Sequence, residues 1–379
     1  MPKKIETLGN GKYRFRIHLG YDSKGKQRVK TKTATAKNLK EAKIIYASLS
    51  KELSQIDPEK VENYTLDLFF DYWKEHYSQE HHELTTQKHY LNLYKRIKPL
   101  LGTKNLLDIQ PFNILEVHKH LRKDKLSSNT IAKYHRFLHS LFSKAIQWNL
   151  VTSNPCSKVD TPRKSSSQKN LYDNENLKAF LKHMTEEPFK YQLMVYLGLL
   201  GGLRREEIFG LEWKHINWEK KFIQIEQVAP CLSGSPGFIK KPKTIQSKRI
   251  VSISDSLLNM LQVHLTAQET EAQLLGSKWI INNRIFTQWN GRPAHPCSFG
   301  TWMTKMYKKH NLPRISPHDL RHLSATHLVN LGIDIRTISG RLGHSRTSTT
   351  TDIYSHLIQS SESESAEKLD TFLKKVTNL

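Results

Sequence analysis

The sequence predicts a multidomain α+β protein in which a small sheet, an all-helical segment and a mixed α/β segment follow one another along 379 residues. Side chains alternate with a period of two near the N-terminus, which is typical of a strand with one buried face. Apolar residues recur at helical spacing over residues 62–155. A polar, serine-rich stretch at 160–171 then precedes about 200 residues in which both patterns occur.

The N-terminal segment is predicted to form a β-hairpin followed by a helix. In residues 13–19 one face holds Tyr13, Phe15, Ile17 and Leu19, and the other holds Arg14, Arg16 and His18. After a turn rich in Gly, Asp and Ser, a second run sets Arg28, Lys30 and Lys32 opposite Val29, Thr31 and Thr33. A helix should begin at Asn38, because Asn38 and Glu41 have the spacing of a capping box.

The chain is strongly basic, and the charge is uneven. Its 59 Lys and Arg residues against 35 Asp and Glu residues give a net charge of +24. Residues 1–60 carry +9, residues 61–160 carry +4 and residues 161–379 carry +11. A polyanion is therefore the expected partner, nucleic acid first and an acidic membrane surface second. The dense N-terminal charge is either a solvated basic face or a sheet that lies against DNA, and we favour the sheet that lies against DNA.

Several classes of protein are disfavoured. No stretch approaches the ~18–20 apolar residues of a membrane helix, and the N-terminus lacks the apolar core of a secretory signal. Cys156, Cys231 and Cys297 are isolated and odd in number, which argues against a disulfide framework or a metal site of the CxxC type. We expect a soluble, intracellular protein with no membrane partner.

The second segment is predicted to be all-helical. Thr65, Thr86 and Ser128 stand where N-caps belong, ahead of amphipathic runs. The longest run places one apolar stripe along a helix, formed by Ile131, Tyr134, Leu138, Leu141, Phe142 and Ala145. The aromatic residues of this segment are interpreted as core residues rather than as a platform for stacking bases.

Four short motifs stand out in the last segment. The first is Gly202-Leu203-Arg204-Arg205-Glu206-Glu207, after an apolar helix at 191–200, and the second is Lys241-Pro242-Lys243-Thr244, within a strand-like stretch that continues to Ile253. The third is Ser316-Pro317-His318-Asp319-Leu320-Arg321, and the fourth is Leu342-Gly343-His344-Ser345, with Tyr354 ten residues on. In the third motif, Ser316-Pro317 is a good helix start. Helical spacing then puts Leu320, Leu323, His327 and Leu331 on one face, and His318 and Arg321 beside each other off that face.

In this order the motifs resemble the tyrosine recombinase family, also called phage-type integrases. The family's pattern is an Arg in a Gly-Leu-Arg-x-x-Glu turn, a hairpin Lys, His-x-x-Arg, a His or Trp after Leu-Gly, and a C-terminal Tyr. The resemblance implies a catalytic set of Arg204, Lys243, His318, Arg321, His344 and Tyr354, with Glu207 as a supporting acid. Lys240, Lys241 and Lys248 lie near Lys243 and are alternatives for the hairpin lysine.

The chemistry of DNA strand exchange fits these residue types. By resemblance Tyr354 attacks the DNA and forms a 3′-phosphotyrosine, which conserves the bond energy for rejoining. Arg204 and Arg321 would bind the scissile phosphate, because guanidinium groups pair with phosphate oxygens in a bidentate manner. Lys243 would protonate the leaving 5′ oxygen, His344 would donate to the phosphate, and His318 would either accept the tyrosine proton or donate to the phosphate. No cofactor or metal is expected, since the sequence offers neither a carboxylate cluster nor HExxH.

The resemblance also implies three domains and an assembly. Residues 1–57 correspond to an arm-type DNA-binding domain with a three-stranded sheet and a helix, and Arg14, Arg16, Arg28, Lys30 and Lys32 would contact DNA. Residues 62–158 correspond to a helical core-binding domain, and residues 169–379 to the catalytic domain with its C-terminal tail. The expected partners are double-stranded DNA at arm and core sites, further copies in a tetramer, an excision factor and a host DNA-bending protein. The expected process is integration and excision of a mobile element, a phage or a conjugative transposon.

Two other functions are compatible with parts of the pattern. A type IB topoisomerase uses a similar Arg/Lys/His/Tyr set but does not need the two N-terminal modules. A non-catalytic, site-specific DNA-binding protein could retain the scaffold, although it would have no use for Tyr354 together with every basic partner.

Overall fold

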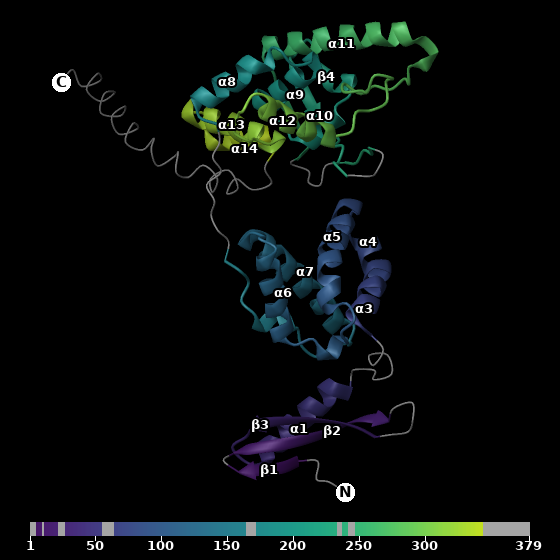
Figure 1. The fold of residues 1–379 in the computed structure, drawn as a ribbon, viewed down its shortest axis with the longest axis vertical. Coiled ribbons are helices and arrows are strands. Elements are labelled where there is room, and N and C mark those ends of the chain that lie inside the picture. The colour runs from purple at the N-terminus through teal and green to yellow at the C-terminus, as the bar shows by residue number, and fades with distance from the viewer. Residues whose placement is uncertain are drawn as a thin grey trace, which may run out of the picture. The chain divides into compact units, whose positions relative to one another are not determined.

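The structure is a computed structural model that describes residues 5–9, 11–21, 27–54, 64–163, 172–232, 237–241 and 247–343. For residues 18–21, 27, 28, 30 and 50–54 it describes the backbone alone. The chain divides into two compact units, residues 1–168 and residues 169–379, which are considered separately (Figure 1). No helix in the described part is both long and apolar enough to cross a membrane.

The N-terminal sheet forms as predicted. Strands β1 (Ile5–Gly9), β2 (Lys12–Tyr21) and β3 (Gln27–Thr35) pair antiparallel in the order β1-β2-β3, and helix α1 (Leu39–Ser54) follows. The predicted cap is confirmed, since the side-chain oxygen of Asn38 accepts a hydrogen bond from the Glu41 amide at 2.9 Å. Phe15 and Ile17 are fully buried and pack with Ala42 of α1 in a small core of their own.

The register of β2 and β3 distributes the basic residues over both faces of this sheet. Arg14 pairs with Thr33 and Arg16 with Thr31, so these side chains share the face that α1 does not cover. Lys32 pairs with Phe15 and therefore belongs to the other face. Among the described side chains, the cationic face that we expected to lie against DNA therefore contains Arg14 and Arg16 but not Lys32. The side chains of Arg28 and Lys30 lie outside the described residues.

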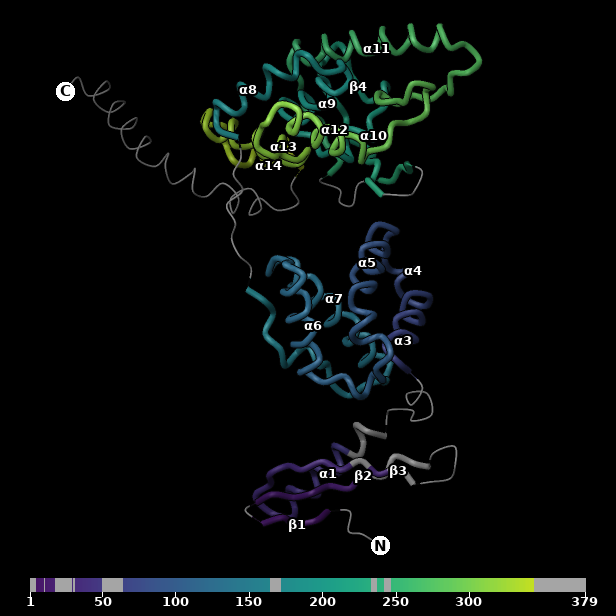
Figure 2. Tube along the Cα trace, in the orientation of Figure 1, coloured from purple at the N-terminus to yellow at the C-terminus, as the bar shows by residue number. Residues whose placement is uncertain are grey.

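The rest of the first unit is helical, as predicted. It contains α3 (Leu66–Trp73), a π-helix (Lys74–Ser78), α4 (Gln79–His81), α5 (Leu84–Leu101), a 3-10 turn (Leu106–Asp108), α6 (Pro111–Lys123), α7 (Ser128–Gln147) and a 3-10 turn (Pro155–Lys158). The Phe70 ring stacks on Tyr94 with centroids 3.7 Å apart, which joins α3 to α5. All six residues of the predicted α7 stripe are buried. Figure 2 traces the backbone of α5, α6 and α7 in this unit. The aromatic residues at this core are therefore packing residues.

Two of the three predicted caps are misplaced by a few residues. Thr65 is confirmed, because its hydroxyl accepts from the Leu68 amide. Helix α5 begins two residues before Thr86, with Glu83 at the cap, and α7 is capped by Ser127 rather than Ser128. At α7 the adjacent Ser127 and Ser128 offer equivalent acceptors, so sequence pattern alone does not select between them, whereas α5 begins without a side-chain cap.

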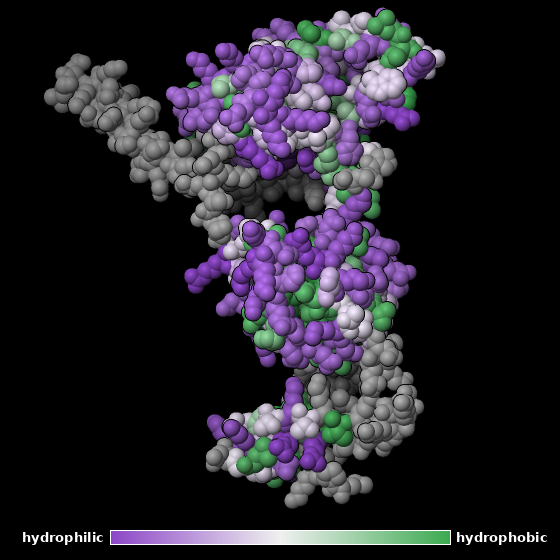
Figure 3. All heavy atoms as spheres, viewed as in Figure 1, coloured by the Kyte–Doolittle hydropathy of each residue, from purple (hydrophilic) through white to green (hydrophobic). Residues whose placement is uncertain are grey.

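The second unit surrounds a buried central helix with helices and a small sheet. Its elements are α8 (Asn174–Met184), α9 (Phe189–Leu199), α10 (Arg205–Gly210), a 3-10 turn (Trp213–His215), β4 (Ile216–Asn217), β5 (Phe222–Ile225), β6 (Arg249–Ser252), α11 (Asp255–Leu275), a 3-10 turn (Gly276–Lys278), α12 (Cys297–Lys309), α13 (Pro317–Asn330) and α14 (Ile335–Leu342). The strands pair antiparallel in the order β4-β5-β6. Gly198 lets α9 approach α13 closely, because a Cβ there would lie 3.1 Å from the Leu320 Cβ. Hydrophilic side chains dominate the visible described surface (Figure 3).

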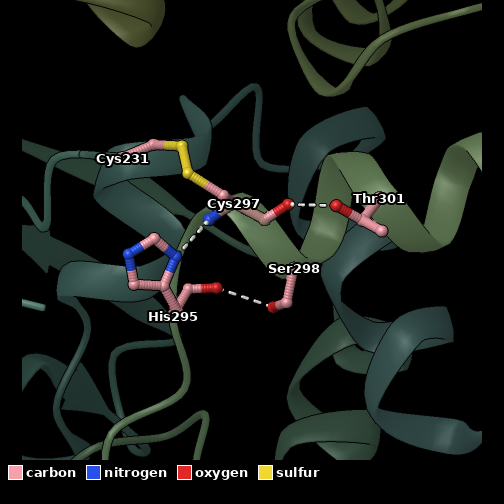
Figure 4. The surroundings of a disulfide bond; sticks show 5 residues. All are labelled: Cys231, His295, Cys297, Ser298 and Thr301. Atoms are coloured by element: carbon pink, nitrogen blue, oxygen red, sulfur yellow. Dashed lines mark hydrogen bonds between the residues drawn. A yellow bond between two sulfur atoms is a disulfide. The ribbon is translucent and has the colours of Figure 1, made fainter. Parts of the chain in front are cut away.

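The structure corrects the expectation about cysteines. Cys231 and Cys297 form a disulfide with their Cα atoms 5.3 Å apart, although 66 residues separate them in the sequence. The bond ties the segment after β5 to the first residue of α12 (Figure 4). The neighbouring His295 supports that helix start, since its Nδ1 accepts from the Cys297 amide at 3.2 Å. Cys156 is buried apart from this pair, and burial raises the pKa of its thiol to about 12.

The disulfide predicts a stability that depends on redox conditions. Cys231→Ser should lower the free energy of unfolding by about 2–5 kcal/mol in oxidising buffer, because the variant loses the constraint on its unfolded chain. Reductant should destabilise the wild type similarly and leave the variant unchanged, which chemical denaturation can measure. Alkylation of unfolded, unreduced protein should label Cys156 alone. Labelling of all three thiols in that experiment would contradict the pairing.

Candidate active site

The first motif forms a tight turn that leads into α10. Gly202 has φ +63°, a conformation that favours glycine, and a Cβ at this position would lie 2.8 Å from the Leu342 Cδ2. The turn places Arg204 at the N-cap of α10 and Glu207 one turn later. A Glu207 carboxylate oxygen accepts from the Arg204 amide at 2.8 Å, so the acid also caps its own helix.

Glu207 is the centre of a buried guanidinium cluster. Its side chain is 2% exposed, and its two oxygens accept hydrogen bonds from both outer nitrogens of Arg249 at 2.9 Å. Arg204 contributes a third contact at 2.7 Å from its Nη1. The Nη1 of Arg321 lies 4.0 Å from the same carboxylate. One carboxylate is thus shared by three arginines from three different elements.

This environment keeps Glu207 ionised. Burial alone would raise the pKa of its carboxyl group, but the Arg249 hydrogen bonds and the charges of Arg249, Arg204 and Arg321 lower that pKa to about 2. The pairing offsets the large cost of burying these charges. Removing the carboxylate would leave the buried guanidinium groups without a counter-charge, which is strongly destabilising.

The arginines also bind backbone carbonyls near the end of α14. Arg204 donates to the Gly343 carbonyl at 2.9 Å, and Arg249 donates through Nε to the Arg341 carbonyl at 2.6 Å. Arg321 donates to the Leu342 carbonyl and to the Gly202 carbonyl, the latter at 2.8 Å. The cluster therefore joins the α9–α10 turn, β6 and α13 to the residues that immediately precede His344.

Helix α13 begins at the predicted residue, but Arg321 lies on its buried face. It starts at Pro317 after Ser316, and Asp319 accepts from both the amide and the hydroxyl of Ser316. Arg321 is only 2% exposed, so it points into the packed side rather than lying off it. At the end of the expected apolar face Leu331 is 75% exposed, because the helix ends at Asn330.

His318 lies at the exposed N-terminal end of α13, one turn before Arg321. Its ring packs edge-on against His322, with centroids 4.6 Å apart. His327, further along the helix, is half-buried as expected for a boundary histidine. Lys243, His344 and Tyr354 lie outside the described residues.

Arg249 is the member of the cluster that the sequence motifs do not single out. It is the first residue of β6, in the stretch that the sequence predicts to be strand-like. Alternation along β6 puts Arg249 on the same face as buried Val251. A lone arginine on the apolar face of a short strand was the available signal, since such a charge requires a buried partner.

The chain matches the phage integrase family over residues 170–360 and the phage integrase SAM-like domain over residues 68–160. The chain belongs to the phage integrase family. It is therefore a tyrosine recombinase, an enzyme that cleaves and rejoins DNA strands. This assignment favours recombination over the topoisomerase and non-catalytic alternatives.

Relatives match the chain nearly end to end. It is 27% identical to the ICEBs1 integrase of Bacillus subtilis strain 168, across 97% of this chain and 100% of that protein. It is 28% identical to a tyrosine recombinase XerC-like protein of Caldanaerobacter subterraneus subsp. tengcongensis, across 98% of this chain and 99% of that protein.

Solved structures confirm the multidomain α+β fold. The Tn1549 transposon integrase in complex with transposon right end DNA superposes with a TM-score of 0.70, at 22% identity, over 81% of this chain and 100% of that chain. The lambda integrase tetramer bound to a Holliday junction gives a TM-score of 0.58 at 16% identity, over 93% of this chain and 95% of that chain.

The cluster predicts a large effect of neutralising its acid. Glu207→Gln keeps the side-chain shape but leaves three guanidinium groups without a counter-charge, so it should lower the free energy of unfolding by about 3–5 kcal/mol. Glu206→Gln, one residue earlier on the same helix, is the matched control and should stay within about 0.5 kcal/mol of wild type. Equal stability of the two variants in urea would contradict the role of Glu207.

The depressed pKa predicts an acid-sensitive contribution to stability. A carboxyl group with a folded-state pKa below its ordinary value of 4.5 stabilises the protein above that value and loses the contribution as the pH falls towards about 2. Urea denaturation from pH 5 to about 2 should therefore show a steeper loss for wild type than for Glu207→Gln. If wild type and Glu207→Gln lost stability equally as the pH fell, the acid sensitivity would arise from other carboxylates and the prediction would be wrong.

Proposed function

We propose that the Glu207-centred cluster is the phosphate-binding part of the recombinase active site. The observation that carries the proposal is that Arg204, Arg249 and Arg321 all donate to the Arg341–Gly343 backbone. His344 is the next residue, and Tyr354 follows ten residues later. The cluster thus anchors the segment that leads to the expected nucleophile.

The proposed roles follow from charge and exposure. Arg204 is 32% exposed on its side chain, so its guanidinium can contact a phosphate while Glu207 holds it. Arg321 is 2% exposed and lies 4.0 Å from the Glu207 carboxylate, so its proposed contribution is a buried positive charge that stabilises the phosphate electrostatically. His318, exposed at the N-terminal end of α13, is suited to contact the phosphate or to take the tyrosine proton.

The proposed reaction is a transesterification. The phenolic oxygen of Tyr354 loses its proton, attacks the scissile phosphorus and forms a 3′-phosphotyrosine while the bond to the 5′ oxygen breaks. Lys243 donates a proton to that 5′ oxygen and His344 donates to the phosphate. Rejoining reverses these steps. The cationic surroundings are needed because an unperturbed phenol has a pKa of about 10.

The proposal extends to the biological assembly. Residues 1–57 would bind arm sites, residues 62–158 and the catalytic domain at 169–379 would bind the core site, and four copies would act on two duplexes. Similarity to the transposase from transposon Tn916 of Enterococcus faecalis supports a transposon rather than a phage as the mobile DNA. An excision factor and a host DNA-bending protein are further proposed partners, in the bacterial cytoplasm.

Tyr354→Phe should bind DNA normally but form no covalent adduct and no recombinant. The substitution removes only the nucleophilic oxygen, so binding contacts are kept. The test incubates the protein with a nicked suicide substrate and detects the adduct by denaturing electrophoresis. Tyr307→Phe is the matched control: Tyr307 is buried and donates to Thr304, so it should keep wild-type adduct formation. A covalent adduct formed by Tyr354→Phe would show that another residue is the nucleophile.

Removing residues 1–57 should separate two kinds of DNA binding. The shortened protein should still nick the core site but lose binding to separate arm sites. In the full chain, Arg14→Ala with Arg16→Ala should reduce the salt dependence of arm binding by about 0.9 per lost phosphate contact. Lys32→Ala, on the opposite face of the sheet, is the control. Identical footprints of the full-length and shortened proteins on the attachment DNA would overturn the arm assignment.

A further inference from the structure

Two histidines and a glutamate meet at the ends of α8 and α12, and none of them belongs to the Glu207-centred cluster. His183 is in the last turn of α8, Glu186 follows it in the connection to α9, and His310 is the C-cap of α12. One nitrogen from each ring and one carboxylate oxygen lie within 4.8 Å of one another. The proposed recombination chemistry makes no use of this group.

Each of the two histidines has one buried ring nitrogen without a hydrogen-bond partner. The Nδ1 of His183 and the Nε2 of His310 are both excluded from solvent and have no hydrogen-bond partner. The His310 side chain is 10% exposed, and its ring stacks on His183 with centroids 3.9 Å apart. Leaving two such nitrogens unpaired is unfavourable, so their placement indicates a ligand that both can bind.

The electrostatic surroundings favour a cation. Glu187 is nine-tenths buried beside the group, with one carboxylate oxygen 3.9 Å from the His310 Nε2. Its carboxylate oxygens accept hydrogen bonds from the Trp302 indole at 2.9 Å and from Lys309 at 3.3 Å. Glu187 is therefore an anchored carboxylate next to Glu186, and its charge is partly offset by Lys309.

We propose that His183, Glu186 and His310 bind a divalent cation of the zinc class. Two imidazole nitrogens and one carboxylate oxygen are a ligand set that zinc accepts in tetrahedral geometry, with water as the fourth ligand. Bonds of about 2.0–2.2 Å are compatible with ligand atoms that all lie within 4.8 Å of one another, and the exposed Glu186 side chain can rotate to adjust its oxygen to the ion. Bound in this way, the ion fastens the end of α8 to the end of α12.

The test uses the full-length protein, stripped with chelator, and titration calorimetry with Zn²⁺. We expect close to one ion per chain in a high-affinity step. His183→Ala, His310→Ala and Glu186→Gln should each weaken that step by at least about tenfold, as loss of a ligand does. Because Glu186 is exposed, Glu186→Gln should fold even if one of the histidine variants does not, so the test can still be read from this variant. His81→Ala, which removes an exposed imidazole from the helical unit, is the matched control and should titrate like wild type.

Thermal unfolding supplies a second readout. Zn²⁺ should raise the melting temperature of wild type and of His81→Ala but not of the three site variants. The recombination chemistry is separate, so DNA cleavage by Glu186→Gln should equal that of wild type with or without chelator. Absence of a one-to-one step in wild type, or equal Zn²⁺ affinity in wild type and all three variants, would overturn the proposal and leave a simple histidine stack.

Discussion

The ionised carboxylate of Glu207, buried among three guanidinium groups, is the interaction on which the active-site architecture depends. Removing a carboxylate from water is costly. Here the cost is offset by the bidentate contact with Arg249 and by the hydrogen bond from Arg204. Once paired, the arginines have fixed orientations, and their remaining donors bind the backbone at Arg341, Leu342 and Gly343. A single acid thus sets the position of both the arginines proposed to bind the phosphate and the chain that leads to Tyr354.

Much of this architecture could be predicted from local sequence. The cap at Asn38, the buried stripe of α7 and the helix start at Ser316-Pro317 rest on interactions within a few residues, which periodicity and capping chemistry describe well. The pairing of Arg204 with Glu207 is also local, because one helical turn separates them. The ordered motifs therefore identify three of the four cluster members, Arg204, Glu207 and Arg321, from the sequence alone.

The remaining features depend on contacts between distant segments. Arg249 meets Glu207 across 42 residues, and Cys231 meets Cys297 across 66, so neither pair has a local pattern. Arg321 points inward because the Gly202 turn and the end of α14 offer carbonyls there, which helical spacing on α13 alone does not reveal. Likewise the separation of Arg14 from Lys32 onto opposite faces follows from strand register rather than from alternation within one strand.

A double-mutant cycle on single-turnover DNA cleavage tests the central claim most directly. If the Glu207–Arg249 pair acts as a unit that orients Arg204 and Arg321, Glu207→Gln and Arg249→Met should each slow cleavage by about 100-fold or more, as misplacement of catalytic groups does. The double variant should then be no slower than the worse single variant, because the pair is already broken in either one. Two effects that multiply in the double variant would show that the residues act independently and would contradict the account.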